Sequence, residues 1–390
     1  MTVPGNVTVG WLLPDGRVAG RDSADRIVRL SGRAVPGDVV RATSGDDPRV
    51  DAIVVPSPDR RTPPCVWSAR CGGCDLDAMR PEARRTALAA MVQQALSLAS
   101  PPAVRWLLDS RRKRIRLGLR DGDVGYYEPR SHTLVPVAAC IRAAEPLSDA
   151  IVTLRGWLQT HGGAGLDAVD LRTDGKRVVY AFTSVGSVPR AVRDAMPTLG
   201  DVALDGRTVC GDTRLMLPVA GAELRASAGS FTQVAMGMDD MLVAHVCDAL
   251  SGATRVLDLY AGIGTFAVSI ARSGLPVTAV ELEGAAVEDL RFNARGLPID
   301  VVAKPVERFD ATRVAFDAVV LDPPRAGAPG VLPKLLIQRP THLVYVACFA
   351  PSAARDLRPA LSAGYKITDV TCFDLFPDTH HIETVITLRR

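Results

Sequence analysis

The sequence predicts an α/β protein whose C-terminal part is an open, doubly wound and mostly parallel sheet. Three observations predict this fold. After about residue 230, apolar strands such as RVLDLY, FDAVVLD and HLVYVAC alternate with amphipathic helical stretches, which is the rhythm of βαβ units. Before residue 58 the strands are short and separated by turn residues, and between the two regions helix and strand patterns mix. We therefore expect three domains, at residues 1–58, 59–229 and 230–390.

Length and composition agree with a globular protein of several domains. A chain of 390 residues is long enough for two or three cores. Hydrophobic residues make up 47% and charged residues 23%, which argues against extensive disorder. No apolar run approaches the roughly 18 residues of a membrane span. The N-terminal residues lack a basic stretch followed by an apolar one, so no secretory signal is expected. We expect a cytoplasmic monomer with reduced thiols.

Residues 1–58 predict a small β-barrel. The segments VTVGWLL, RIVRL and VDAIVVPSP are short, β-prone and bounded by Pro, Gly and Asp, as the strands of such barrels are. Small barrels often bind nucleic acid. The net charge of the whole chain is only +3, so charge alone does not establish a nucleic-acid partner.

The central region predicts an α+β domain. A loop rich in Pro, Gly and Cys precedes a helix over 81–99, and residues 111–140 indicate a hairpin with a DGD turn. Between Arg105 and Arg120 lie seven Lys or Arg and a single Asp. This basic strand is either an ordinary solvated face or a surface that contacts phosphates, and the residues alone leave both open.

Four cysteines of the central region indicate a metal site. Cys65, Cys71 and Cys74 follow a C-x5-C-x2-C spacing, and Cys140 comes after the hairpin. Four soft ligands suit either structural zinc or an iron–sulfur cluster. Zinc ribbons usually pair two C-x2-C motifs, and here the fourth cysteine stands alone. The spacing therefore favours a [4Fe-4S] cluster over zinc, with a chance grouping as the third alternative.

The strongest local signal lies at the end of the first C-terminal strand. The strand holding Asp258 continues into Tyr260-Ala-Gly262-Ile-Gly264 and then a helix, and glycines there allow a ligand to approach the backbone. We therefore expect Asp258, Gly262 and Gly264 to bind the cofactor. Glu281 ends the next strand, about 20 residues on, where an acid accepts ribose hydroxyls. Because G-x-G-x-x-G is absent, S-adenosylmethionine is favoured over NAD. A plain strand–turn–helix joint is the remaining alternative.

Three further strand ends carry candidate catalytic groups. Asp322-Pro-Pro-Arg325 places a carboxylate on a rigid turn beside the expected ligand crevice. Cys348 ends the next strand, just before a helix that could lower its pKa toward the thiolate. An inert core thiol is the alternative reading of that residue. Glu383 enters the last apolar strand, where burial would raise its pKa and suit proton transfer; most such residues are only exposed strand ends.

Together these motifs resemble the RNA uracil-C5 methyltransferases of the TrmA/RumA type, and more closely their iron–sulfur branch. The resemblance spans nearly the whole chain. Residues 1–58, with the turn Ala-Val-Pro-Gly-Asp at 34–38, resemble its N-terminal TRAM domain, which is OB-like. The PPC-x5-CGGC stretch with Cys140 matches its cluster ligands. The basic residues around Lys113 and the segments 125–127 and 131–132 resemble its RNA-facing strands. A class I methyltransferase sheet is implied for 230–390.

The resemblance also implies residue roles. Gln233, in Ser-Phe-Thr-Gln at 230–233, corresponds to a glutamine that binds the cofactor. Further cofactor contacts fall on Tyr260, Thr265, Glu281 and Asp322. The nucleophile falls on Cys348 and the base on Glu383. Two positions depart from the family. The usual Ser-Cys-Asn-Pro is here Ala347-Cys-Phe349-Ala-Pro, and Thr265 replaces the frequent Asn or Asp. Both departures bear on substrate choice more than on reaction type, because the catalytic atoms are retained.

The implied reaction makes 5-methyluridine. A Cys348 thiolate adds to uracil C6, C5 takes the methyl group, and Glu383 removes the C5 proton before the thiolate leaves. Asp322 would hold the uracil edge and Arg325 would steady developing negative charge. The fourth strand lacks the Pro-Cys of RNA cytosine-C5 methyltransferases. It also lacks the aromatic residue that follows Pro-Pro in exocyclic-amine methyltransferases. Ribosomal RNA, in particular 23S rRNA, is favoured over tRNA. The alternatives are tRNA uracil-C5 methylation and a non-catalytic, RNA-binding iron–sulfur protein.

Overall fold

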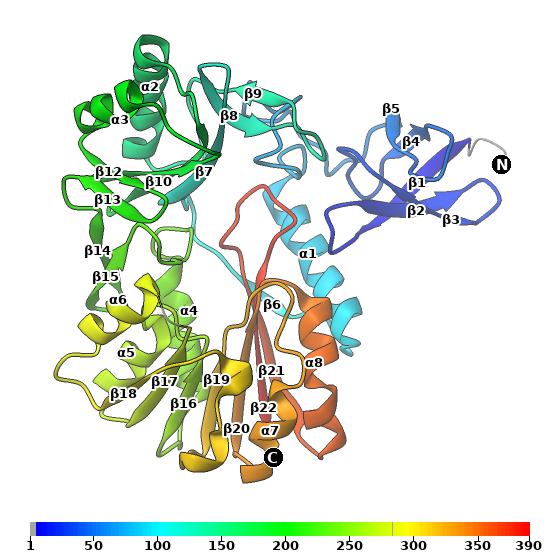
Figure 1. The fold of residues 1–390 in the computed structure, drawn as a ribbon. Helices are drawn as coiled ribbons and strands as arrows, with labels where there is room; N and C mark the ends of the chain where they lie inside the picture. The colour runs from blue at the N-terminus through cyan, green and yellow to red at the C-terminus, as the bar shows by residue number, and fades with distance from the viewer. Residues whose placement is uncertain (1–4, 283) are drawn as a thin grey trace.

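The computed structural model describes residues 5–282 and 284–390. Figure 1 shows three regions: an N-terminal β-domain in blue, a central lobe from cyan to green, and a C-terminal lobe from yellow-green to red. No helix among the described residues is long and apolar enough to cross a membrane.

The N-terminal region is a closed five-stranded barrel, as predicted. Its strands are ordered β3-β2-β1-β4-β5, and every neighbouring pair is antiparallel. The edges meet through a parallel bridge between Ser31 and Arg49, with the Val50 amide donating to the Ser31 carbonyl at 2.9 Å. Alternate side chains such as Val7 and Val9 fill the interior. The strands are β1 (Asn6–Leu12), β2 (Val18–Asp22), β3 (Ile27–Leu30), β4 (Val39–Ala42) and β5 (Val50–Val55).

The central lobe is a seven-stranded sheet ordered β13-β12-β11-β10-β7-β8-β9. Its members are β7 (Arg114–Arg120), β8 (Asp123–Tyr127), β9 (Leu134–Pro136), β10 (Leu166–Thr173), β11 (Val178–Ser184), β12 (Asp201–Leu204) and β13 (Arg207–Cys210). Helix α2 (Glu145–His161) packs Leu147, Ile151 and Leu154 against it, and α3 (Arg190–Ala195) follows. The predicted hairpin is confirmed: Asp121 and Gly122 both have positive φ, as a two-residue turn between twisted strands requires.

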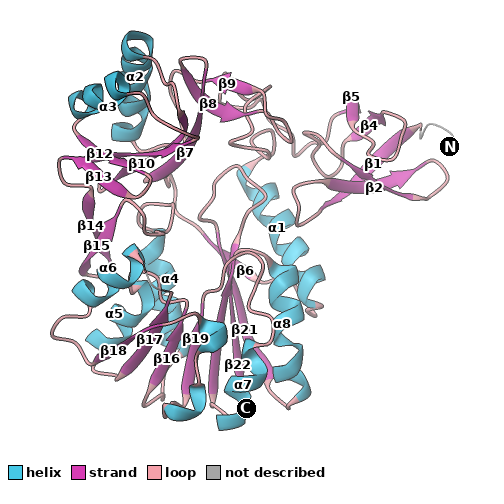
Figure 2. Cartoon of the chain, viewed as in Figure 1, coloured by secondary structure: helices cyan, strands magenta, loops and turns pink. Residues whose placement is uncertain are grey.

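The C-terminal lobe is an eight-stranded sheet ordered β18-β17-β16-β19-β20-β22-β21-β6. Helices cover both faces of its strands (Figure 2). The strands β16 to β20 are parallel, and β22 is antiparallel to both neighbours. The strands are β16 (Val256–Leu259), β17 (Val277–Glu281), β18 (Ile299–Ala303), β19 (Ala318–Leu321), β20 (His342–Ala347), β21 (Lys366–Phe373) and β22 (Glu383–Arg389). The helices are α4 (Met238–Ala249), α5 (Thr265–Arg272), α6 (Ala285–Asn293), α7 (Val331–Leu335) and α8 (Ala350–Ser362).

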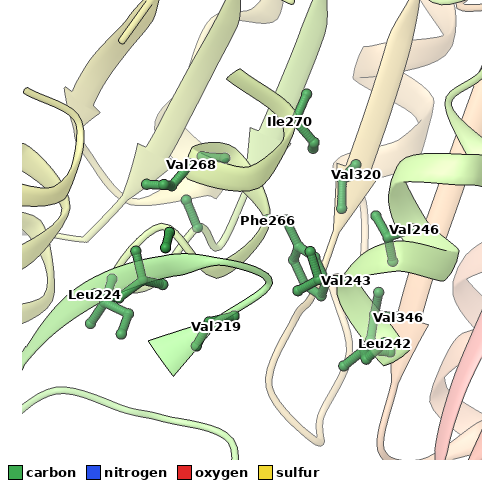
Figure 3. Close-up of a cluster of buried hydrophobic side chains, with 14 of the residues drawn as sticks. Val219, Leu224, Leu242, Val243, Val246, Phe266, Val268, Ile270, Val320 and Val346 are labelled. Atoms are coloured by element: carbon green, nitrogen blue, oxygen red, sulfur yellow. The ribbon is translucent and has the colours of Figure 1, made fainter. Parts of the chain in front are cut away.

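The two faces of this sheet bury separate cores. Val256, Val320 and Val346 pack toward α4 and α5 with Leu242 and Phe266, as Figure 3 shows in part. Their neighbours in the same strands pack toward α7 and α8. Successive side chains of a strand point to opposite faces, so a strand covered on both sides is apolar throughout. This explains why these strands could be found from their apolar runs.

Two segments of the central region pack on the C-terminal lobe. Strand β6 (Ala103–Arg105) pairs in parallel with β21, and α1 (Pro81–Leu96) lies against α8. The hairpin of β14 (Arg214–Val219) and β15 (Ala222–Ser227) contributes to the core of α4 and α5. The domain boundaries at 58 and 229 stay a prediction, and the hydrophobic cores cross both of them. The sequence pattern missed β6 and β21, because β6 has only three residues and the first five residues of β21 are exposed or half-buried, so they form no apolar run.

Candidate active site

A single pocket at the carboxyl ends of β16, β17, β19 and β20 brings most of the predicted site residues together. Its cavity measures about 670 Å³, and its place follows from the rule for open parallel sheets. The predicted residues that line it are Gln233, Tyr260, Gly262, Thr265, Glu281, Asp322, Arg325, Cys348 and Glu383. Their convergence from distant parts of the chain indicates one site. The roles assigned to single residues stay predictions.

The glycine-rich turn forms one wall of the pocket. Gly262 and Gly264 have φ of 58° and 94°, and the intervening chain leads directly into α5. A Cβ on Gly264 would lie 2.8 Å from Leu290 Cδ1, so glycine is needed there for both conformation and space. Tyr260 also has positive φ, and its hydroxyl donates to Glu307 at 2.9 Å. The turn is therefore held open toward the cavity.

Glu281 lies beside this turn at the end of β17. Its Oε2 accepts from the Gly262 amide at 2.7 Å, and its Oε1 accepts from the Leu282 amide at 2.9 Å. A carboxylate oxygen can accept a second hydrogen bond. The side chain is thus fixed in place while it keeps the capacity to bind two ligand hydroxyls.

Asp258 and Gly264 do not line the pocket, although both were predicted to bind the cofactor. Asp258 lies in the middle of the buried β16 and is fully inaccessible. Burial, and next the charge of Asp322, raise the pKa of Asp258 well above its ordinary value. Gly264 precedes α5 and packs against Leu290. Asp258 lies inside the sheet and Gly264 is part of the turn itself, and neither residue lines the cavity.

A buried network fixes the segment that carries Gln233. Asp289 of α6 accepts from the Ser230 hydroxyl at 2.6 Å and from the Ser227 amide at 2.7 Å. Arg172 of β10 donates to the Ser230 carbonyl at 2.5 Å. The central sheet, through Arg172, and α6, through Asp289, therefore fix the position of this segment at the rim of the pocket. Sequence reasoning missed Arg172 and Asp289, because neither lies in a recognisable motif.

Two of the carboxyl groups that line the pocket have raised pKa values: Glu383, which is buried, and Asp322, which is half-buried. Burial, and next the charge of Glu281, raise the pKa of Asp322 to about 7. Burial, and next the charge of Asp322, raise the pKa of Glu383 well above its ordinary value. Glu383 is 4% exposed, so the expectation that it is partly desolvated holds. Groups of this kind can exchange protons near neutral pH.

The expectation of a lowered pKa for Cys348 was wrong. Burial raises the pKa of this thiol to about 11, and the charges of Glu383 and Asp322 add to the rise, while Arg325 opposes it. Helix α8 begins two residues later, but its N-terminus does not outweigh desolvation and two acidic neighbours. In the protein without ligands, Cys348 is therefore a protonated thiol.

The barrel reaches the mouth of the same pocket. Arg325 donates to the carbonyl of Pro14, in the β1–β2 turn, at 3.5 Å. The same guanidinium lies over the ring of Phe349, with 4.8 Å to the ring centroid. Such stacking of a cation on an aromatic face is attractive. One rim of the pocket thus brings together Pro14 of the barrel, Arg325 after β19 and Phe349 after β20. The sequence did not indicate this meeting.

The four predicted metal ligands line one smaller pocket. Cys65, Cys71, Cys74 and Cys140 lie around it, and burial raises the pKa of Cys74 to about 12. Hydrogen-bond donors face the sulfurs: the Gly73 amide is 3.4 Å from Cys71 Sγ. Within residues 5–282 and 284–390, no three His, Cys, Asp or Glu side chains are already arranged to hold a single metal ion. The structure brings the cysteines together but does not establish a metal.

The fold and the pocket define an S-adenosylmethionine-dependent methyltransferase. Comparison with known proteins narrows this class. Residues 303–390 match the family model described as tRNA (Uracil-5-)-methyltransferase. The chain is 30% identical to the 23S rRNA (uracil(1939)-C(5))-methyltransferase RlmD of Chromohalobacter salexigens, over 98% of this chain and 89% of that one. It is 29% identical to an uncharacterized RNA methyltransferase of Caulobacter vibrioides, over 95% and 96%. The chain belongs to the RNA uracil-C5 methyltransferase family.

A solved structure shares the fold of the whole chain. The tRNA (uracil-54, C5)-methyltransferase of Pyrococcus abyssi, in complex with S-adenosyl-L-homocysteine, superposes with a TM-score of 0.78 at 21% identity. The match covers 98% of this chain and 100% of that one. The fold class predicted from the sequence is thereby confirmed.

Proposed function

We propose that this protein methylates C5 of a uridine in 23S rRNA, with S-adenosylmethionine as methyl donor. The observation that carries the proposal is the meeting of Cys348, Asp322 and Glu383 in one pocket with the glycine turn and Glu281. This constellation provides a nucleophile, two carboxyl groups with raised pKa values and a place for an adenosine moiety. Ribosomal RNA is favoured over tRNA because relatives that match over most of their length are named 23S rRNA methyltransferases.

The pocket fits S-adenosylmethionine. Its volume of about 670 Å³ lies within the range of small-molecule sites, and Glu281 retains acceptors for the two ribose hydroxyls. Bound there, the cofactor would supply a methyl group made electrophilic by a positively charged sulfur. Gln233 also lines the pocket, on the segment held by Asp289 and Arg172. A nearby positive charge would also favour the ionised form of the Cys348 thiol.

The chain's own residues then account for each proton. Cys348 gives its proton to solvent, and the thiolate sulfur bonds to C6 of the uracil, which moves the electron pair of the C5–C6 double bond onto C5 and the adjoining carbonyl. Asp322 holds the polar edge of the base, and Arg325 stabilises negative charge at its oxygen. After C5 has taken the methyl group, Glu383 removes the C5 proton. The electron pair of that C–H bond restores the double bond as the sulfur–C6 bond breaks.

We further propose that the four cysteines hold a [4Fe-4S] cluster. The fit rests on the donor set: four soft ligands line one pocket, and N–H groups of Gly73 and Arg112 lie within 3.4 and 3.8 Å of the sulfurs of Cys71 and Cys74. Hydrogen bonds of this kind surround cluster thiolates and tune their potentials. Zinc is the alternative, and elemental analysis of iron, sulfide and zinc in anaerobically purified protein separates the two.

The substrate assignment has a direct test. Ribosomal RNA and tRNA from a strain lacking the gene would be incubated separately with the protein and labelled S-adenosylmethionine, and then digested to nucleosides. The proposal predicts label in 5-methyluridine from the 23S fraction. Label only in the tRNA fraction would transfer the assignment to tRNA, and label in another nucleoside would contradict the uracil-C5 reaction. We expect the protein in the cytoplasm, with this RNA, and as a monomer.

A further inference from the structure

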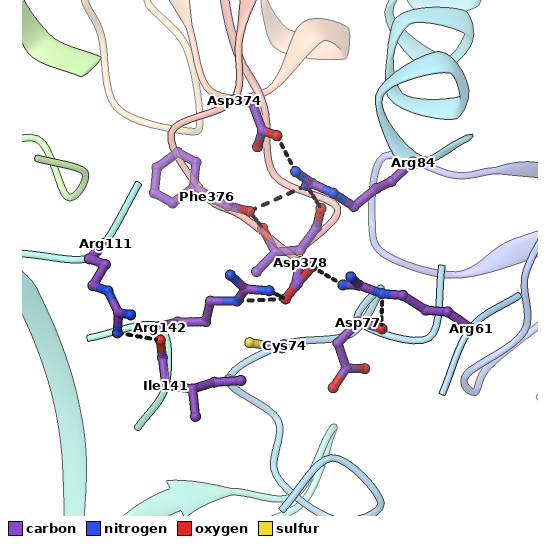
Figure 4. A network of polar contacts seen from close by, with 12 residues as sticks. Arg61, Cys74, Asp77, Arg84, Arg111, Ile141, Arg142, Asp374, Phe376 and Asp378 are labelled. Carbon is purple, nitrogen blue, oxygen red and sulfur yellow. Dashed lines mark hydrogen bonds and ion pairs between the residues drawn. The ribbon is translucent and has the colours of Figure 1, made fainter. Parts of the chain in front are cut away.

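The loop that delivers Glu383 to the pocket is held by the cysteine-bearing segments. This loop, residues 374–382, joins β21 to β22, and Glu383 is the first residue of β22. We call it the base loop. It belongs to the C-terminal lobe in sequence, but its contacts reach residues adjacent to Cys74 and Cys140 (Figure 4).

The residues directly after Cys74 bind the base loop along its backbone. The Leu76 amide donates to the Asp378 carbonyl at 2.9 Å. The Asp75 carboxylate accepts from the His380 amide at 3.0 Å and pairs with the His380 ring. Gly16 of the barrel packs against the His380 ring, since a Cβ on Gly16 would lie 2.7 Å from His380 Nδ1. The loop is therefore tied to the cysteine segment by main-chain as well as side-chain bonds.

Asp378 is the centre of this arrangement. Its side chain is 5% exposed and lies between two guanidinium groups. Arg61 donates to Oδ1 at 2.8 Å, and Arg142, two residues after Cys140, donates to Oδ2 at 2.6 Å. Asp378 also has a φ of 63°, which aspartate and asparagine tolerate better than most residues. One buried carboxylate thus joins both sides of the cysteine pocket to the base loop.

A third arginine secures the start of the loop. Arg84 of α1 donates to the Thr379 carbonyl at 2.9 Å and pairs with the Asp374 carboxylate. Its side chain is only 3% exposed. The loop is consequently fixed at Asp374, Asp378 and His380, immediately before Glu383. The strands β21 and β22 already pair directly with each other, so these additional contacts fix the position of the loop rather than connect the strands.

We infer that Asp378 is a positioning residue, which holds the base loop on the cysteine segments and so places the Glu383 carboxylate for removal of the C5 proton. The inference rests on the proposed function. Misplacement of a catalytic group by about 1 Å can slow a reaction by about 100-fold. Loosening the loop should therefore slow the elimination step, while the cofactor turn and the central sheet, which lie elsewhere, keep their geometry.

The test is the variant Asp378→Asn, which keeps size and tolerance of positive φ but removes the negative charge between Arg61 and Arg142. We expect kcat to fall on the order of 10- to 100-fold, with KM for RNA and the affinity for S-adenosylhomocysteine changed little. A covalent protein–RNA species should accumulate, because sulfur is released only after proton removal. Iron content and visible absorption should match the wild type. The control is Asp310→Asn, an exposed carboxyl paired with Arg313.

Arg61→Gln provides a second variant if Asp378→Asn does not accumulate as folded protein. Hydrogen exchange of the 374–382 amides should accelerate in either variant and in wild-type protein stripped of its metal. Unchanged kcat with unchanged exchange would overturn the inference. The inference would also be overturned if the loss of activity merely matched a loss of cofactor-binding protein and no covalent adduct accumulated. Wild-type protein that makes no 5-methyluridine would instead contradict the proposed function, and the exchange measurement would still decide on the loop.

Discussion

Asp322 and Glu383 line the same pocket, where burial, and next the charge of the half-buried Asp322, raise the pKa of Glu383. Burial is also the larger cause of the raised pKa of Asp322. An acid pair of this kind destabilises the folded protein, because one carboxyl group keeps its proton at a pH at which the same group in water would be ionised. Natural proteins keep such pairs where function requires them, so this relationship marks the chemical centre of the pocket.

Asp322→Asn should stabilise the ligand-free protein at neutral pH. The folded pKa of Asp322 is about 7, above its ordinary value of 3.8, so the wild type loses stability as pH rises between these values. The variant lacks this loss. We expect its advantage in free energy of unfolding to grow from pH 4 to 7 and to reach on the order of 2 kcal/mol. Urea unfolding at several pH values measures it, with the exposed Asp46→Asn as control; a constant difference would contradict the shift.

Cys348→Ala should abolish methyl transfer and leave cofactor binding within a few-fold. The thiol is the only group proposed to bond to the substrate, whereas the glycine turn and Glu281 form the proposed cofactor site. Calorimetric titration with S-adenosylhomocysteine and a transfer assay measure the two effects. Cys247→Ala is a matched control, because burial also raises the pKa of Cys247 to about 11 but this residue lies outside the pocket. Loss of cofactor affinity by orders of magnitude would refute the division of roles.

Glu383→Gln should accumulate a covalent RNA–protein adduct. Glutamine has nearly the same shape but cannot take the C5 proton, so sulfur remains bonded to C6. A denaturing gel would show a slower species that contains label from the methyl donor. The double variant Cys348→Ala/Glu383→Gln should lose it. Absence of the slower species in the single variant would count against Glu383 as the base.

Cys71→Ser should reduce the yield of soluble protein before it affects chemistry. The cysteine pocket joins three parts of the chain, since Arg33 of the barrel donates to the Cys71 carbonyl and Arg112 donates to the Gly73 carbonyl at 3.0 Å. Without a bound cluster these segments lose a shared anchor. Cys210→Ser, at the edge of the central sheet, should remain soluble. A soluble, cluster-free and fully active Cys71→Ser protein would refute a structural role.

Much of the C-terminal fold could be predicted because its strands are buried on both faces, so their apolar runs are visible in the sequence. The ends of those strands then indicated that Asp322, Cys348 and Glu383 lie near one crevice. Electrostatics could not be predicted in the same way. The raised pKa of Cys348 comes from burial and from the charges of Glu383 and Asp322, which lie 35 and 26 residues away in the sequence. Only the folded chain shows that these charges converge on a half-buried thiol.

Long-range polar contacts were also beyond sequence reasoning. Asp378 is one aspartate in a loop, and its partners Arg61 and Arg142 lie in other regions of the chain. Likewise, nothing local connects Arg325 with the carbonyl of Pro14. Such contacts have no periodicity or fixed spacing, so they appear only when the three regions are assembled.

The most direct test of the central claim is a trapping experiment on 23S rRNA that contains 5-fluorouridine. Fluorine at C5 cannot leave as a proton does, so the methylated intermediate should remain bonded to the enzyme. Peptide mass analysis after nuclease digestion should find the methylated fluorouridine on Cys348. A stable adduct on another cysteine, or no adduct although unmodified rRNA is methylated, would contradict attack by Cys348 and proton removal in this pocket.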